Sequence, residues 1–381
     1  MQFDQQAADD WQAGRRQDAL ARMWDLAVRA DADAVILLQA LYYMYCADAF
    51  GPAQQIARLA VQRFPDDPAL LLNGGVIELR MEDHAAARAL FERYRARGGP
   101  EASSLDGLAT ACHALGDDET AASWGAMAIE AKSRRADERS PPFALGPARS
   151  QGADVIAFSL WGDHPRYLRG ALLNAIRAPS LYPGFTCRFL IDSTVPADLV
   201  AALEDRGADV RRDDRPQDLL HRLARRFLVA DDPGVRRYLV RDADSVINSR
   251  EAAAVAEWIA DGRPFHVMRD WWTHTDPMLA GLWGGIGGAL PPVGPMLAAY
   301  QTDHMETAHI DQWFLRDCLW PSVRPAAMVH DRCFRTDGSR PFPTPPPPGD
   351  EHVGQNEHHN PSAHQTSELA RFSRTVPSLG L

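Results

Sequence analysis

The chain has 381 residues, 45% of them hydrophobic, and a formal net charge of −11. This composition is that of a globular protein with two or three domains, and its charge argues against nucleic acid or an anionic membrane surface as partner. Lys132 is the only lysine among 40 basic residues. Beyond it, a Walker-type phosphate loop and a lysine Schiff base are therefore excluded.

Cysteine usage and the N-terminus indicate a compartment. The five cysteines are scattered and form no C-x-x-C motif, which favours a reducing environment. The opening stretch MQFDQQAADD is acidic and unlike a secretory signal. No apolar run approaches the roughly 20 residues of a membrane span. We therefore expect a cytoplasmic protein without a membrane span.

The N-terminal third repeats itself. Alanines recur every 34 residues, at Ala19, Ala53, Ala87 and Ala121. Each repeat predicts two amphipathic helices, for example "ALLLNGGVIELRM" followed by "HAAARALFERYRAR". Small residues at fixed positions let paired helices approach closely, and stacked pairs share one core. Residues 1–133 resemble tetratricopeptide repeats. The resemblance implies a helical-hairpin solenoid with a surface for a protein, a peptide or the substrate of a neighbouring domain.

A change of rhythm follows a charged, Pro- and Gly-rich linker at 134–152. Between 153 and 355, short apolar runs alternate with helical stretches. The runs are "DVIAFSL", "CRFLID", "ADVRR", "RRYLVRD" and "PFHVMRD". This alternation predicts an α/β domain with a mostly parallel central sheet. The last stretch, 356–381, is polar and His-rich, and we expect it to be a disordered tail.

The tripeptide Asp-Ala-Asp occurs twice, with different settings. The copy at Asp31–Asp33 falls in the turn between the first two repeats, where Asp is favoured in turns and helix caps. The copy at Asp242–Asp244 directly follows the apolar run "YLV". Open α/β sheets bind ligands at the carboxyl ends of their strands. Two carboxylates there suit a hard divalent cation such as Mg²⁺ or Mn²⁺.

This setting resembles the D-x-D motif of GT-A-fold glycosyltransferases. The resemblance covers about residues 154–355: a nucleotide-binding βαβ half, an apolar strand that ends in D-x-D, and an acceptor half. It implies a metal-dependent transfer of a sugar from a nucleotide-sugar, most simply a UDP-sugar, to an acceptor. By that resemblance Asp242 and Asp244 would hold Mn²⁺ or Mg²⁺ on the donor diphosphate.

Further residues are candidates, Asp311 and the histidines by the same resemblance and the others by their chemistry. Asp311 in "HIDQWFL" looks like an acceptor-side aspartate that acts as base. His330, after the apolar run "AAMV", is the preferred third metal ligand, with His352 as the alternative. Arg241 is a candidate for binding the diphosphate. Trp271 and Trp272 are candidates for stacking on the sugar or the base.

Two other interpretations stay open. In one, the protein is an adaptor that acts through its repeats, and its α/β domain is an inactive glycosyltransferase-like domain. In the other, the D-x-D belongs to a haloacid-dehalogenase-type phosphohydrolase, although that motif normally opens its domain. The H-x-x-G-x-K-P-W ending and the N-S-G loop of several glycosyltransferase families are absent from the sequence. The sugar, the acceptor and the stereochemical outcome therefore stay open.

Overall fold

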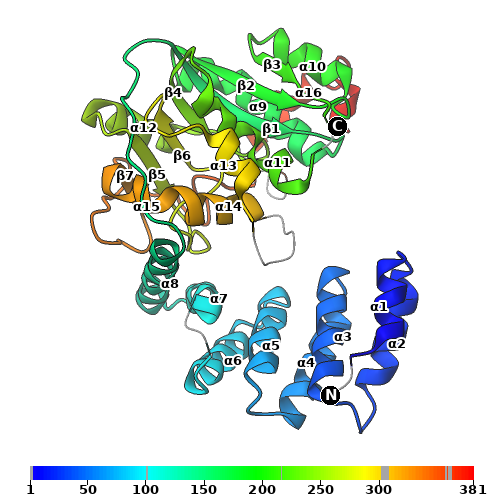
Figure 1. The fold of residues 1–381 in the computed structure, drawn as a ribbon. Helices are drawn as coiled ribbons and strands as arrows, with labels where there is room; N and C mark the ends of the chain where they lie inside the picture. The colour runs from blue at the N-terminus through cyan, green and yellow to red at the C-terminus, as the bar shows by residue number, and fades with distance from the viewer. Residues whose placement is uncertain (1–2, 100–101, 216, 302–308, 357, 359–362) are drawn as a thin grey trace. The chain divides into compact units, whose positions relative to one another are not determined.

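The computed structural model describes residues 3–99, 102–215, 217–301, 309–356, 358 and 363–381 (Figure 1). The chain divides into two compact units, Met1–Ala131 and Lys132–Leu381, called here the repeat unit and the α/β unit. The division falls within two residues of the boundary expected at 133. No helix among the described residues is long and apolar enough to cross a membrane.

The repeat unit consists of consecutive helical pairs (Figure 1). Its helices are α1 (Gln5–Gln12), α2 (Arg16–Ala27), α3 (Ala34–Cys46), α4 (Phe50–Arg63), α5 (Pro68–Arg80), α6 (His84–Ala96), α7 (Ala102–Ala114) and the first part of α8 (Asp118–Arg139), which from Lys132 on belongs to the α/β unit. All four alanines of the 34-residue period are fully buried, as expected for small residues between closely packed helices. Asp33 caps α3 by accepting hydrogen bonds from the backbone of Val35 and Ile36. The first Asp-Ala-Asp thus has a structural role.

The α/β unit is built on a seven-stranded sheet. The strands are β1 (Ala153–Leu160), β2 (Phe185–Ile191), β3 (Asp209–Arg212), β4 (Val235–Val240), β5 (Phe265–Arg269), β6 (Trp283–Ile286) and β7 (Ala327–Asp331). Their order in the sheet is β3-β2-β1-β4-β6-β5-β7. All neighbours pair in parallel except β6, which runs antiparallel to β4 and β5. The predicted class, a helical region followed by a mostly parallel sheet, is confirmed.

Helices cover both faces of this sheet. Alternate residues of β1 point to opposite sides, so Val155 and Ala157 join one core while Ile156 and Phe158 join the other. The first core includes α11 (Leu219–Ala224), η1 (Arg225–Asp231), α13 (Val293–Ala299), α14 (Ile310–Phe314), η2 (Leu315–Leu319) and α15 (Trp320–Val323). The second includes α9 (Pro165–Leu181), α10 (Ala197–Glu204), α12 (Ser249–Asp261), α16 (Ala363–Ala370) and η4 (Pro377–Leu379). A short turn, η3 (Arg324–Ala326), precedes β7.

Two segments differ from the expectation. Helix α8 continues to Arg139, several residues into the predicted linker. The predicted disordered tail forms α16 and η4, because three of its apolar residues, Leu369, Val376 and Leu379, are buried in the second core. These apolar residues are spaced widely among polar ones, so the sequence did not indicate a buried apolar face in this segment. Residues 357 and 359–362 of the predicted tail lie outside the described residues.

Candidate functional site

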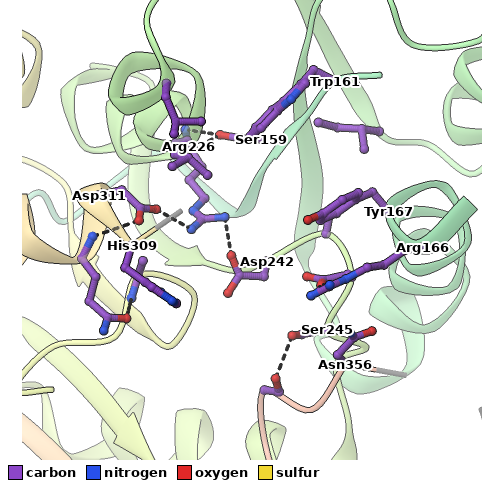
Figure 2. Close-up of a pocket in the computed structure, with 18 residues that line it drawn as sticks. Ser159, Trp161, Arg166, Tyr167, Arg226, Asp242, Ser245, His309, Asp311 and Asn356 are labelled. Carbon is purple, nitrogen blue, oxygen red and sulfur yellow. Dashed lines mark hydrogen bonds and ion pairs between the residues drawn. The ribbon is translucent and has the colours of Figure 1, made fainter. Parts of the chain in front are cut away.

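A pocket of about 360 Å³ opens at the carboxyl ends of β1 and β4. Figure 2 shows its walls. Its described lining comprises Ser159, Leu160, Trp161, Arg166, Tyr167, Leu219, Leu223, Arg226, Asp242, Ala243, Asp244, Ser245, Ala280, His309, Asp311, Gln312, Gly354 and Asn356. Three of the predicted site residues, Asp242, Asp244 and Asp311, therefore line one pocket. Because β1 and β4 are adjacent and parallel, the loops that follow them meet at this edge.

The loop after β4 is held in place by α9. Buried Asn174 donates from Nδ2 to the carbonyl of Ser245 (3.0 Å) and accepts at Oδ1 from the backbone of Ile247 (2.9 Å). At Gly170, a Cβ would overlap the carbonyl oxygen of Ala243. Glycine at this position thus lets α9 approach the backbone between the two aspartates closely. The loop then ends at Asn248, which caps α12 through a hydrogen bond from Glu251.

The two aspartates of the D-x-D have different environments. The Asp242 side chain is 42% exposed, and its Oδ1 lies 2.6 Å from the guanidinium of Arg226. The Asp244 side chain is only 8% exposed and accepts a hydrogen bond from Nε of Arg166 at 2.6 Å. Burial, and then the neighbouring charge of Asp242, raise the pKa of Asp244, while Arg166 opposes that rise. Asp242 therefore presents the more accessible carboxylate to the pocket.

Asp311 enters the same pocket from the first turn of α14. Its Oδ1 accepts a hydrogen bond from the backbone of Gln312 (2.9 Å), and its Oδ2 accepts one from Arg226 (2.9 Å). The residue is only 2% exposed. Burial raises the pKa of Asp311 to about 6, although Arg226 partly offsets this effect. A carboxyl group with this pKa exchanges protons readily near neutral pH.

Arg226 connects the two halves of the pocket. It lies in η1, is buried, and bridges Asp242 and Asp311 (Figure 2). Burial opposes its charge, but the carboxylates of Asp242 and Asp311 outweigh this and raise the pKa of Arg226. Its backbone N–H donates to Oγ of Ser159, which in turn donates to the carbonyl of Leu223. Arg226 and Arg166 could not be predicted as site residues from the sequence, because no local motif distinguishes them from other arginines.

Two predicted residues lie away from this pocket. Arg241 is buried, with Nε 2.6 Å from Oε1 of Glu251, and also donates to backbone carbonyls, so its guanidinium has structural partners. His330 is fully buried, and its Nδ1 lies 2.8 Å from Nε2 of His266. It sits on β7, which β6 and β5 separate from β4. The structure therefore does not bring His330 to the aspartates. The sequence did not show this, because the order of strands in a sheet cannot be read from the strand ends.

The remaining aromatic and histidine candidates form a separate cluster. Trp271 stacks on His352, with ring centroids 4.5 Å apart, and Trp272 packs edge-on against Phe334. None of Trp271, Trp272 and His352 belongs to the described pocket lining. The structure thus places these candidates in the loop after β5 and beside the segment after β7, while Trp161 is the tryptophan that lines the pocket.

The pocket carboxylates are also candidate metal ligands. Among the described residues, no group of three or more His, Cys, Asp or Glu side chains is arranged to hold a metal ion. Mg²⁺ is commonly held by one or two carboxylates, with water and substrate phosphates completing its shell. Asp242 and Asp244 can supply such a pair, because both line the pocket and Asp242 is partly exposed. The donor set therefore fits a divalent cation that also contacts a substrate.

Comparisons with known proteins give little further information. No family model matches the chain, and no curated protein matches it. Among solved structures, the chain is similar to an O-GlcNAc transferase mutant from Thermobaculum terrenum, with 15% sequence identity and a TM-score of 0.28. That match covers 54% of this chain and 45% of the other. A likeness at this level establishes no shared function, so the function proposed below depends on the pocket.

Proposed function

We propose that the protein is a metal-dependent glycosyltransferase, which moves a sugar from a nucleotide-sugar, most simply a UDP-sugar, to an acceptor. The observation that carries this proposal is the convergence of Asp242, Asp244 and Asp311 on one pocket at the carboxyl edge of the sheet. The order of parts also supports it. A βαβ half (β1 to β3) precedes β4, the D-x-D follows β4, and Asp311 comes from the later half.

The charges of the pocket support the involvement of a cation. Two arginines face three aspartates among the described lining residues. A nucleoside diphosphate would add further negative charge, which these arginines alone do not balance. In this proposal Asp242 and Asp244 hold Mn²⁺ or Mg²⁺, and the ion supplies neutralisation of the departing diphosphate. Arg166 and Arg226, which both line the pocket, contribute fixed positive charge at its opposite sides (Figure 2).

Asp311 is the proposed base. Its ionised carboxylate would accept the proton of the acceptor hydroxyl as that oxygen attacks the sugar, and a pKa near the working pH suits this task. Arg226 holds Asp311 and Asp242 at a fixed separation, because its guanidinium bonds to both. The pocket would thus align the acceptor hydroxyl at Asp311 with the donor held at Asp242. The repeat unit would bind a protein or peptide, and the acceptor itself is one candidate for that partner.

The test is donor binding, measured by calorimetry with UDP in the presence and absence of Mn²⁺. We expect UDP to bind more tightly with Mn²⁺, and the Asp242→Ala/Asp244→Ala variant to lose this metal-dependent binding. The chain offers a matched control, since Asp31→Ala/Asp33→Ala removes the same tripeptide from a repeat turn and should leave UDP binding unchanged. Hydrolysis of a panel of nucleotide-sugars would then identify the sugar.

If UDP and Mn²⁺ both fail to bind, or if both double variants behave alike, the glycosyltransferase proposal fails. The adaptor interpretation would then be preferred. Release of phosphate from a phosphomonoester, without any nucleotide-sugar turnover, would instead favour a phosphohydrolase.

A further inference from the structure

Lys132, the only lysine in the chain, is buried in the α/β unit, in the C-terminal part of helix α8. Its ammonium donates to Oδ2 of Asp276 at 3.1 Å and to the carbonyl of Thr275 at 3.2 Å. The Asp276 side chain is only 14% exposed, and its Oδ1 has no hydrogen-bond partner among the described residues. Loss of the ammonium would therefore remove the cation that contacts this buried carboxylate directly, and only electrostatic attraction to Arg316 would oppose the cost of its charge.

The same oxygen of Asp276 leads to the pocket. It accepts a hydrogen bond from Nε2 of Gln312 at 2.7 Å. At the other end of that amide, Oε1 of Gln312 lies 3.5 Å from the backbone nitrogen of Ala280. The carboxylate thus helps to determine which way the amide faces. A reversed amide would set its oxygen against the carboxylate, where both groups are acceptors, and its NH₂ against the N–H of Ala280, where both are donors.

Gln312 and Asp311 are adjacent in the first turn of α14, and both line the pocket. The backbone N–H of Gln312 donates to Oδ1 of Asp311 at 2.9 Å. The contacts therefore run without a break from Lys132 through Asp276 and Gln312 to Asp311. Lys132 itself does not belong to the described pocket lining, so any effect on chemistry would be indirect, and Asp276 and Gln312 provide a route for it.

We propose that Lys132 is a positioning residue for the candidate base Asp311, acting through Asp276 and Gln312. This inference rests on the proposed function. By holding the Asp276 carboxylate, the ammonium fixes the Gln312 amide, and with it the turn of α14 that presents Asp311 to the acceptor. Displacement of a reacting group by about 1 Å is enough to slow catalysis strongly.

The first test is kinetic, with the nucleotide-sugar that the wild-type protein hydrolyses fastest. Lys132→Met should lower kcat by about tenfold or more, with KM for the nucleotide-sugar changed by less than about twofold. Adding Asp276→Asn should restore most of kcat, because the asparagine oxygen still accepts from Gln312 and no charge is left unpaired.

A matched control separates positioning from general stability. Arg139 is another cation of α8 that faces a buried carboxylate, with its Nη1 3.5 Å from Asp317. Arg139→Met should leave kcat within about twofold of the wild-type value. Equal losses of kcat in Lys132→Met and Arg139→Met would overturn the inference, as would a folded Lys132→Met/Asp276→Asn variant that stays as slow as Lys132→Met.

The second test needs no substrate. Because Lys132 is the only lysine, protein labelled with ¹⁵N-lysine gives one side-chain ammonium resonance. Gln312→Met should shift that resonance, because Gln312 and Lys132 both donate to Oδ2 of Asp276 and the substitution removes one of these two hydrogen bonds. Arg139→Met again serves as the control. An unchanged resonance in Gln312→Met would overturn the proposed connection even if Lys132→Met fails to fold.

The outcomes distinguish this inference from the proposed function. If no nucleotide-sugar is hydrolysed but the lysine resonance responds to Gln312→Met, the contact from Lys132 to the pocket stands and the assigned reaction fails. If hydrolysis depends on Asp242 and Asp244 while Lys132→Met keeps the wild-type kcat, the reaction stands and the positioning role fails.

Discussion

At the scale of single residues, environment gives the three pocket carboxyl groups different roles. Asp242 is partly exposed, Asp244 is buried beside Arg166, and Asp311 is buried beside Arg226. Burial raises the pKa of Asp311 to about 6, well above the usual value for an aspartate. A carboxyl group of this kind can act as a base near neutral pH, whereas Asp242 is better placed to contact a cation or a substrate.

The Asp311 carboxyl should therefore control the pH dependence of turnover. A base works when it is ionised, so kcat/KM for nucleotide-sugar hydrolysis should fall as the pH drops below about 6, by up to tenfold for each further pH unit. Asp311→Asn should reduce the rate by about 10²–10⁴-fold and abolish this acidic limb. A rate that is independent of pH between 5 and 7.5, or an Asp311→Asn variant as active as wild type, would contradict the assignment.

At the scale of elements, the site depends on how closely α9 approaches the loop after β4. Gly170 faces the backbone of Ala243 and Asp244, where no side-chain atom fits without displacement. Asn174, one turn later on the same helix, holds the loop by two hydrogen bonds. The geometry of the D-x-D loop is thus set by α9 as well as by β4.

Gly170→Ala should consequently displace the loop. We expect it to cost about 1–3 kcal/mol in the free energy of unfolding and to weaken UDP binding with Mn²⁺, because the two aspartates shift relative to each other. Gly294→Ala in α13 is a matched control: an added Cβ there would make ordinary contact with Asp231 and should change neither property appreciably. Thermal unfolding and calorimetry on both variants decide the matter, and equal UDP binding by Gly170→Ala would refute the role given to α9.

The elements also show where sequence reasoning succeeds. The run "YLV" before Asp242 identified a strand end, and β4 ends at Val240. Strand order is a tertiary property, so the sequence did not reveal that β7 lies beside β5, far from β4. For the same reason it did not reveal Arg166 and Arg226, whose partners Asp244 and Asp311 are distant in the chain. The carboxylates were predictable because they belong to a local pattern, whereas their guanidinium partners belong to none.

At the scale of the whole molecule, the two units differ in their buried titratable groups. Among the described residues, four histidines of the α/β unit have shifted pKa values: His266, His274, His330 and His352. Burial lowers each of these pKa values, and that of His274 falls to about 3. Mild acid should therefore act chiefly on the α/β unit.

The sign of this effect follows from proton binding. Below the ordinary histidine pKa of 6.5, the unfolded chain binds protons that His266 and His274 do not bind in the folded protein. Stability from these two residues is thus fully present above pH 6.5 and declines as the pH falls, by about 1.4 kcal/mol per pH unit for each fully depressed group. Asp311 acts in the opposite direction, because its folded pKa of about 6 exceeds its unfolded value and the native state gains a proton first.

Calorimetric unfolding at pH 7 and pH 5 should accordingly show a lower midpoint for the α/β unit in acid, with little change for the repeat unit. Asp311→Asn should enlarge the loss, because it removes the group whose protonation favours the folded state. His364→Gln is the control, since that side chain is 79% exposed and should leave the pH response unchanged. A midpoint that rises in acid, or a shift carried by the repeat unit, would show that the buried histidines do not govern the acid response.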